Sequence, residues 1–419
     1  MARQRVMITG FGIACPLGHT VDEFGEALYA GRSCIGPIHG WDVGDHRYTY
    51  GGQFHDFDLS REMPQVRPRD VKHLLRFSQL ALVAADRALH DAGVQLSDEN
   101  LDRIGSSFGT VIGGLGETVE EQARRYFQRG EQGISRWLWS EFTPCATTTH
   151  VAIYYGLRGP STTYSSGCVS GMDTIVWGAE QIRAGKADMM LVGGSDAPFF
   201  PSIWAAIYRS GILAPTPIDG GNIPRPFSVD HDGIVLMEGG SAVMLESETH
   251  ARLRGARIYG ELVGAGNVEE ALPMSALDET GEAFAMTMQR TLFDAGIPPT
   301  DVDWVIAHGT GFAVADVSES RGIETALGKH AFSIPVTSIR GAVGQSFACS
   351  GGLNLAAACL AIRHQRVPPT INFTAPAEGC RLDYVPNVAR TARVRRVLIN
   401  VAGVGGTHSG ILVARYEEA

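Results

Sequence analysis

Apolar, β-branched runs alternate along the chain with longer segments whose apolar residues recur at helical spacing. Residues 5–10 predict a buried strand, and Gly12 predicts the turn that ends it. Apolar positions three and four apart over residues 71–93 predict a helix that stops at a glycine. Residues 103–109 predict the next buried strand. This alternation predicts a layered α/β fold.

The same pattern continues to the end of the chain. Residues 169–185 predict a buried amphipathic helix with Cys168 at its start, followed by a strand within 188–197. Three further strand regions and two further helices are predicted at 257–266, 280–295, 303–311, 351–363 and 395–417, the last being two strands joined by a glycine loop. The two halves resemble each other in pattern and no linker separates them, so we expect one packed body.

Composition narrows the class of protein. Glycine accounts for 51 of 419 residues without a collagen-like period, which indicates close backbone approach in many places. No apolar run is long enough to span a membrane, and the first residues lack signal-peptide features. Seven cysteines without C-x-x-C spacing favour the cytoplasm and exclude a disulfide framework or zinc ribbon. A net charge of −10 disfavours nucleic acid as a partner.

Cys168 is the first candidate for chemistry. It lies in the segment TYSSGCVSGMD, where small neighbours are expected to keep the sulfur open. A helix that begins there would stabilise a thiolate and supply N–H groups to an oxyanion. The alternative is a buried, inert cysteine, which is the usual state of a free cysteine.

His308 is the second candidate, because it lies between a predicted strand and a glycine loop, where catalytic side chains concentrate. A structural histidine is the alternative. Asp316 is predicted either to orient a neighbouring loop or to lie on the surface. The loop 403–410 offers consecutive N–H groups to a phosphate or an oxyanion, although it lacks the spacing of a dinucleotide site. No metal site is predicted.

Seven ordered segments together resemble the β-ketoacyl-acyl-carrier-protein synthases of the thiolase-fold superfamily, in particular the elongating type II ketosynthases. The resemblance covers nearly the whole chain. The segments are RVMITGFGIACPLG, RIGSSFGTVIGGLG, YGLRGPSTTYSSGCVSG, RPFSVDHDGIVLMEGGSAVMLE, IAHGTGFAVAD, TSIRGAVGQSFACSGGLN and AGVGGTHSG.

The resemblance implies two similar βαβαβαββ halves in a five-layered α-β-α-β-α fold, divided as residues 1–255 and 256–419. It implies that Cys168 takes an acyl group from a carrier-protein thioester and that the N–H groups of Cys168 and Val404 form the oxyanion hole. His308 would help to decarboxylate a malonyl thioester, and Thr310 would contact the pantetheine arm. The substrates would be carried on phosphopantetheine, with no cofactor of the enzyme's own.

The chain departs from the family pattern at the second catalytic histidine. The family pattern K-x-x-x-G-H is replaced here, so that Arg340 stands for the lysine and Gln345 for the histidine. Farther along this helix, Asn354 stands where the family usually has an acid. Gln345 can donate an N–H to a thioester or enolate oxygen, but it carries neither a proton nor a charge. Arg340 stays charged and cannot act as a titratable amine. The resulting set is Cys168, His308 and Gln345.

Other departures concern the substrate pocket. Phe312 replaces a threonine, and Val404 replaces a gate phenylalanine, which predicts a pocket for unusual or larger acyl chains. Ile112 matches a pocket position near the family's dimer interface. His408 replaces an asparagine; it either fills that place or substitutes for the missing histidine.

Basic residues within this acidic chain predict docking of an acidic carrier protein. Arg67, Arg69, Lys72 and Arg76 form one stretch, and Arg209 matches a family docking position. A solvated helix face is the alternative.

Three functions follow from these observations. The first is a decarboxylating condensing enzyme of polyketide or specialised fatty-acyl synthesis. The second is a non-decarboxylating acyltransferase or condensing enzyme of the same fold, which Gln345 and Arg340 favour. The third is a partner subunit of a heterodimeric ketosynthase. The resemblance implies a dimer, either of identical chains or with another ketosynthase-like subunit.

Overall fold

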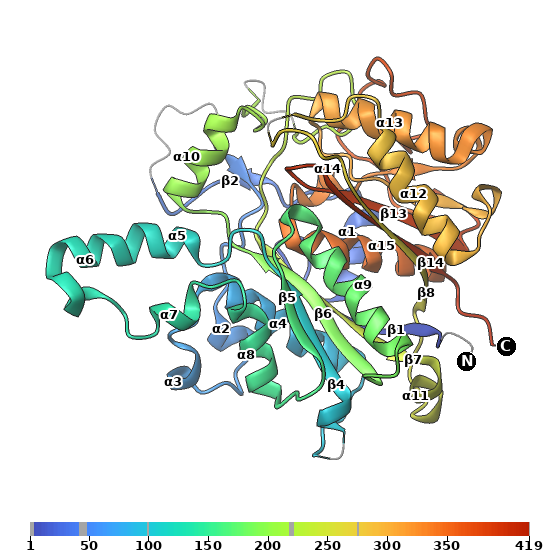
Figure 1. Ribbon diagram of the computed structural model, residues 1–419. Helices are drawn as coiled ribbons and strands as arrows, with labels where there is room; N and C mark the ends of the chain where they lie inside the picture. The colour runs from blue at the N-terminus through green and yellow to red at the C-terminus, as the bar shows by residue number, and fades with distance from the viewer. Residues whose placement is uncertain (1–3, 42–47, 99, 218–221, 275, 419) are drawn as a thin grey trace.

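The computed structural model describes residues 4–41, 48–98, 100–217, 222–274 and 276–418 (Figure 1). Its centre is one ten-stranded mixed sheet with the order β10-β9-β13-β14-β8-β1-β7-β6-β4-β5. The strands are β1 (Val6–Ala14), β4 (Ile104–Gly109), β5 (Ser161–Tyr164), β6 (Met189–Asp196), β7 (Gly239–Ser247), β8 (Gly260–Glu269), β9 (Trp304–Ile306), β10 (Val336–Thr337), β13 (Arg396–Ala402) and β14 (Thr407–Ala414). Two short pairs lie outside it: β2 (Gly36–Pro37) with β3 (Tyr50–Gly51), and β11 (Arg366–Val367) with β12 (Arg390–Thr391).

The sheet consists of two halves with the same topology. In the first, β1 pairs antiparallel with β7, β7 antiparallel with β6, and β6, β4 and β5 run parallel. In the second, β8, β14, β13, β9 and β10 repeat these four pairings in the same order. Antiparallel pairing of β1 with β8 joins the halves. The predicted repeat is therefore visible in the strand order, although it is not visible as sequence identity.

Helices cover the sheet and separate its two halves. Helices α9 and α15 pack against each other between the halves, whereas α4 and α8 cover one outer face and α12 and α13 the other (Figure 1). The bounds are α1 (Val21–Tyr29), α2 (Leu59–Glu62), α3 (Pro68–Val71), α4 (Arg76–Asp91), α5 (Leu115–Glu117), α6 (Ala123–Arg129), α7 (Leu138–Glu141), α8 (Ala146–Tyr155), α9 (Ser170–Arg183), α10 (Pro201–Ser210), α11 (Glu248–Leu253), α12 (Glu282–Ala295), α13 (Ala313–Leu327), α14 (Arg340–Val343) and α15 (Ser350–His364). Among the described residues, no helix is both long and apolar enough to cross a membrane.

Strand periodicity explains why the layers hold together. Successive side chains of a strand point to opposite faces, so a strand buried on both faces needs an unbroken apolar run. In β6, Val192 packs into the core around α9 and α15, whereas the adjacent Leu191 packs into the core beneath α4. A third core lies between the second half of the sheet and helices α12 and α13. The result is the five-layered α/β arrangement.

The first strand corrects one expectation. The sequence predicted a turn at Gly12, but β1 continues through it to Ala14, with a bulge between Ile8 and Gly10. A Cβ on Gly12 would lie only 1.8 Å from the carbonyl oxygen of Ala84 in α4. This glycine therefore allows a helix to approach the strand closely.

Candidate active site

Cys168 lies in a 3-10 turn, Gly167–Val169, that leads into α9. The turn is closed by Ser170, whose hydroxyl accepts the Ser166 N–H at 2.9 Å and donates to the Gly167 carbonyl at 2.5 Å. Only 4% of Cys168 is exposed. The expectation that small neighbours leave the sulfur open is wrong, because Cys168 is buried in an apolar cluster with residues distant in sequence. They include Ile38, Phe199, Leu236 and Phe347.

Two N–H groups from the second half of the chain converge on the Cys168 sulfur. The Gln345 side-chain amide donates to it at 3.2 Å, and the Val404 backbone N–H bonds to it as well. Burial raises the pKa of the thiol, whereas the Val404 amide, the Arg340 charge and the Gln345 amide partly oppose that effect. The resting group at neutral pH is therefore a thiol. Sequence reasoning expected a thiolate stabilised by the helix start.

Gln345 is held rigidly by its backbone. Gly344 precedes it with a φ of +71°, a conformation that favours glycine. The Gln345 N–H donates to the Val235 carbonyl at 2.6 Å, and its carbonyl accepts the Met237 N–H at 3.0 Å. The side-chain oxygen of Gln345 is buried without a hydrogen-bond partner in the described structure. That oxygen is available to a ligand.

Two buried carboxylates fix the loop that carries His308. Glu319 accepts the N–H groups of His308 and Gly309 at 2.7 and 2.8 Å. Asp316 accepts those of Thr310, at 2.9 Å, and Gly311. The prediction that Asp316 orients a neighbouring loop is confirmed, and its surface alternative is wrong because Asp316 is fully buried. Glu319 was missed, although its place three residues after Asp316 puts both acids on one helix face.

His308 is neutral at physiological pH. Its pKa lies well below the usual value because of burial, the nearby Arg340 charge and His408. Burial lowers the pKa of Arg340 to about 10, so the guanidinium remains charged. Arg340 is 1% exposed and donates to the Ser346 hydroxyl at 2.5 Å. Among the described residues it lies behind the cavity wall, not on it.

A cavity of about 760 Å³ opens beside these groups. Its polar wall is formed by His308, Thr310, Gln345, His408 and Glu270, with Val404 at the glycine loop. Its apolar wall includes Ile207, Ile212, Ile234, Met274, Leu277 and Phe312. The Val404 side chain is 63% exposed. The volume and the mixed lining suit a thioester with an apolar tail.

Ile112 packs with the apolar residues around Cys168. Its N–H donates to Asp196 at 2.8 Å. Asp196 also accepts the N–H groups of Val111 and Ala348. Burial raises the pKa of Asp196 to about 6. Sequence reasoning did not find this acid, which ties the wall around Cys168 to the start of α15.

The basic residues fall into two separate groups. Arg67, Arg69 and Lys72 are exposed in and around α3, whereas Arg209 is exposed on α10, and the two helices lie well apart (Figure 1). Arg76 does not extend the first group, because it forms an ion pair with Glu238 at 2.7 Å.

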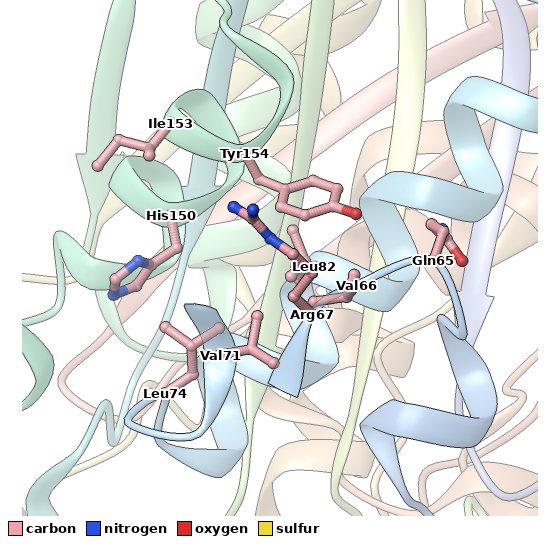
Figure 2. Close-up of a pocket in the computed structure, with 9 residues that line it drawn as sticks. All are labelled: Gln65, Val66, Arg67, Val71, Leu74, Leu82, His150, Ile153 and Tyr154. Atoms are coloured by element: carbon pink, nitrogen blue, oxygen red, sulfur yellow. The ribbon is translucent and has the colours of Figure 1, made fainter. Parts of the chain in front are cut away.

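A second cavity lies beside the first basic group, away from Cys168. Its volume is about 570 Å³, and the Arg67 side chain extends toward the Tyr154 ring (Figure 2). His150 on its wall is bonded to the buried Glu141 at 2.9 Å.

Comparison with known proteins identifies the family. The family model described as "Beta-ketoacyl synthase, N-terminal domain" matches residues 3–251, and "Beta-ketoacyl synthase, C-terminal domain" matches residues 259–374. This chain belongs to the β-ketoacyl synthase family. It is therefore related to condensing enzymes of the acyltransferase type.

Individual relatives of this β-ketoacyl synthase span its whole length. The tetracenomycin polyketide synthase ketoacyl synthase alpha subunit of Streptomyces glaucescens is 36% identical, over 100% of this chain and 98% of the relative. The 3-oxoacyl-[acyl-carrier-protein] synthase 2 of Coxiella burnetii is 34% identical over 99% of each.

Solved structures agree. One is a type II polyketide ketosynthase in complex with its acyl-carrier protein and bound to the hexaketide (TM-score 0.90, 32% identity, 99% of this chain and 100% of that chain). Another is the ishigamide ketosynthase/chain length factor (TM-score 0.90, 30% identity, with the same coverage). The thiolase-like fold is thereby confirmed.

Proposed function

We propose that this chain accepts an acyl group on Cys168 and condenses it with a malonyl-type thioester, both carried on the phosphopantetheine of an acyl carrier protein. The observation that carries the proposal is the convergence of the Gln345 and Val404 N–H groups on the Cys168 sulfur beside the cavity. Named relatives of polyketide and fatty-acyl synthesis support the substrate class. The seven unpaired cysteines support a cytoplasmic location.

Each residue has a place in this reaction. Cys168 is the nucleophile, and its own N–H and that of Val404 bind the thioester oxyanion. Neutral His308 and Gln345 donate to the enolate oxygen that forms when carbon dioxide leaves. Thr310 and Phe312 line the path of the pantetheine arm. Ile112 limits the acyl pocket, and Arg340 supplies a buried positive charge behind it.

A second function is favoured by Gln345. Because an amide cannot carry a proton, the site is also suited to acyl transfer without decarboxylation. Acylation of Cys168 is common to both functions, whereas carbon dioxide release belongs to the first alone.

Pairing with a second chain is supported by the segment that carries α5, α6 and α7. Phe127 and Trp139 on this segment are 85% and 81% exposed, which is unusual for large apolar side chains. The segment projects from the body of the molecule (Figure 1). The partner is a second copy or another ketosynthase-like subunit.

The test combines acyl and malonyl carrier proteins with the enzyme. Intact mass follows acylation of Cys168, and released carbon dioxide is measured in parallel, with Cys168→Ala as the control. Acylation with carbon dioxide and a β-ketoacyl product supports condensation. Acylation and transfer without release of carbon dioxide would contradict condensation and support the second function. No acylation from any donor leaves only the role of a partner subunit.

A further inference from the structure

A buried histidine–carboxylate pair lies in the cavity wall, apart from the three predicted catalytic residues. His408 Nε2 and Glu270 Oε1 are 2.7 Å apart, and their side chains are 1% and 5% exposed. The other Glu270 oxygen accepts the Asp278 N–H at 3.1 Å, so the carboxylate is itself oriented. The Phe284 ring meets the His408 ring edge to face, with centroids 4.4 Å apart.

This contact fixes which nitrogen of His408 is available. A carboxylate accepts, so Nε2 carries hydrogen and bonds to Glu270. Nδ1 is buried and has no hydrogen-bond partner among the described residues. A histidine held by a carboxylate through one nitrogen, with the other nitrogen unpartnered in a substrate cavity, is the arrangement that general bases use.

The chemistry at Cys168 requires such a group. The resting sulfur is a thiol, and thioester exchange needs the thiolate. Gln345 cannot accept a proton, and Arg340 remains protonated. His308 is neutral, with its pKa well below the usual value, so it is a weak base. Asp196 also acts on the sulfur, but its carboxylate already accepts backbone N–H groups, such as those of Ile112 and Ala348.

We propose that His408, oriented by Glu270, carries the proton that Cys168 loses on acylation and regains on condensation. In acylation the thiol proton passes to Nδ1, sulfur bonds to the acyl carbon, and the carrier thiolate leaves with that proton. In condensation carbon dioxide leaves, and the α-carbon bonds to the acyl carbon. The Cys168 thiolate departs and takes a proton that Nδ1 has accepted from solvent after acylation, which leaves His408 neutral for the next cycle.

The charges around His408 favour this assignment. Glu270 from the end of β8 faces it directly and stabilises the imidazolium. His308 is close enough for a charge on His408 to lower its pKa, so the two imidazoles do not hold protons together. The charge of Arg340, which lies on α14, also lowers the pKa of His308. Asp278 on the cavity wall is occupied by the N–H groups of Thr280 and Ala283 at the start of α12.

The first test does not depend on turnover. In protein labelled at histidine Cε1, NMR follows the titration of His408, assigned by its loss in His408→Asn. Glu270→Gln keeps a hydrogen-bonding side chain but removes the charge, so the His408 midpoint should fall by about one pH unit or more. The exposed His90 is the internal control. An His408 resonance that does not titrate, or that ignores Glu270→Gln, overturns the proposal.

The second test measures Cys168 acylation by an acyl thioester across pH. In the parent enzyme the rate should rise and then level off once His408 is neutral. His408→Asn should lower it about 10²-fold at pH 7 and remove the plateau, leaving a tenfold rise per pH unit. Glu270→Gln should move the rise to lower pH, and His90→Asn should change nothing.

A uniform loss at every pH would assign the pair a purely structural role and overturn the proposal. The inference rests on Cys168 acylation, which belongs to the proposed function. If no donor acylates Cys168, the proposed function fails, and the NMR titration still decides the state of His408.

Discussion

Each half of the molecule contains a cysteine in a 3-10 turn at the start of a long central helix, but the surroundings of the two sulfurs are opposite. Cys168 precedes α9 and receives N–H groups from Gln345 and Val404. Cys349 precedes α15, is fully buried, and donates its own S–H to the Gly239 carbonyl at 2.8 Å. Burial and the nearby Asp196 raise the pKa of Cys349 well above its ordinary value.

The difference shows that a helix start does not by itself activate a cysteine. Both sulfurs have that feature, and both are buried. The two cysteines differ in the groups that contact each sulfur from the other half of the chain. The second half supplies N–H donors to Cys168, whereas the Asp196 charge raises the pKa of both thiols. Cys168 therefore has N–H donors that favour its thiolate, whereas Cys349 donates its own S–H.

The largest expected effect comes from removing each sulfur in turn. Cys168→Ala should abolish acylation, because Cys168 is the thiol that the cavity-wall residues Gln345 and Val404 contact. Cys349→Ala should leave the acylation rate within about threefold, since this change removes only a buried S–H bond. Intact mass after incubation with an acyl thioester measures both. Substantial acylation of Cys168→Ala would mean that the nucleophile is misassigned, with exposed Cys145 as the first suspect.

The next effect comes from making the surroundings of Cys168 resemble those of Cys349. Gln345→Leu removes the side-chain donor and should lower the acyl-transfer rate about 10²- to 10³-fold, as loss of one positioned donor does elsewhere. Gln345→His keeps a donor and should retain activity within about tenfold of the parent enzyme. Rapid-quench measurement of the acyl-enzyme gives both rates. Equal losses in the two variants would show that the donor is unimportant.

The pKa difference between the thiols gives a smaller, spectroscopic effect. The difference in thiolate absorbance between the parent enzyme and Cys168→Ala should titrate with a midpoint above 9.0, the ordinary cysteine pKa. Burial of Cys168 raises its pKa more than the N–H donors lower it. Replacing Arg340 by Met should move that midpoint higher, since the guanidinium charge favours the thiolate. Cys349→Ala should not shift the midpoint. A midpoint near 7 in the parent enzyme would contradict the assignment of a resting thiol.

The sequence was sufficient for much of the fold, for reasons that particular residues illustrate. Helix periodicity located α9, α12 and α15 to within a few residues, because each buries an apolar face. It misplaced the end of β1, since Gly12 serves helix packing there and a glycine in sequence does not reveal which use applies. The family resemblance placed Gln345 near Cys168, and the structure brings them into contact. The roles of both residues stay predictions.

The supporting acids could not be predicted in the same way. Asp196 and Glu270 are distant in sequence from Ala348 and His408, which they hold. Glu319 is only 11 residues from His308, but it is an ordinary acid in its local pattern. Their importance arises from burial, which only the packed structure shows. The exposure of Cys168 was mispredicted for the same reason, because the apolar residues that cluster with it come from several separate segments.

The smallest expected change in rate concerns the surface on which a carrier protein would dock to deliver its acyl group to Cys168. Arg209 lies on α10, whose residues Ala206, Ile207 and Ser210 line the cavity, whereas α3 lies farther away. Charge reversal in Arg209→Glu should lower kcat/KM for an acyl carrier protein about fivefold by slowing encounter, with kcat unchanged and the loss reduced at high salt.

Lys72→Glu is the matched comparison, because it makes the same change of charge at an exposed position near α3. If docking uses the cavity mouth of one chain, this variant should change kcat/KM less than twofold. A small acyl thioester without the carrier protein should react equally with both variants and the parent, since no docking occurs. Equal losses from Arg209→Glu and Lys72→Glu would instead indicate a carrier protein that bridges both regions, as a second subunit could arrange.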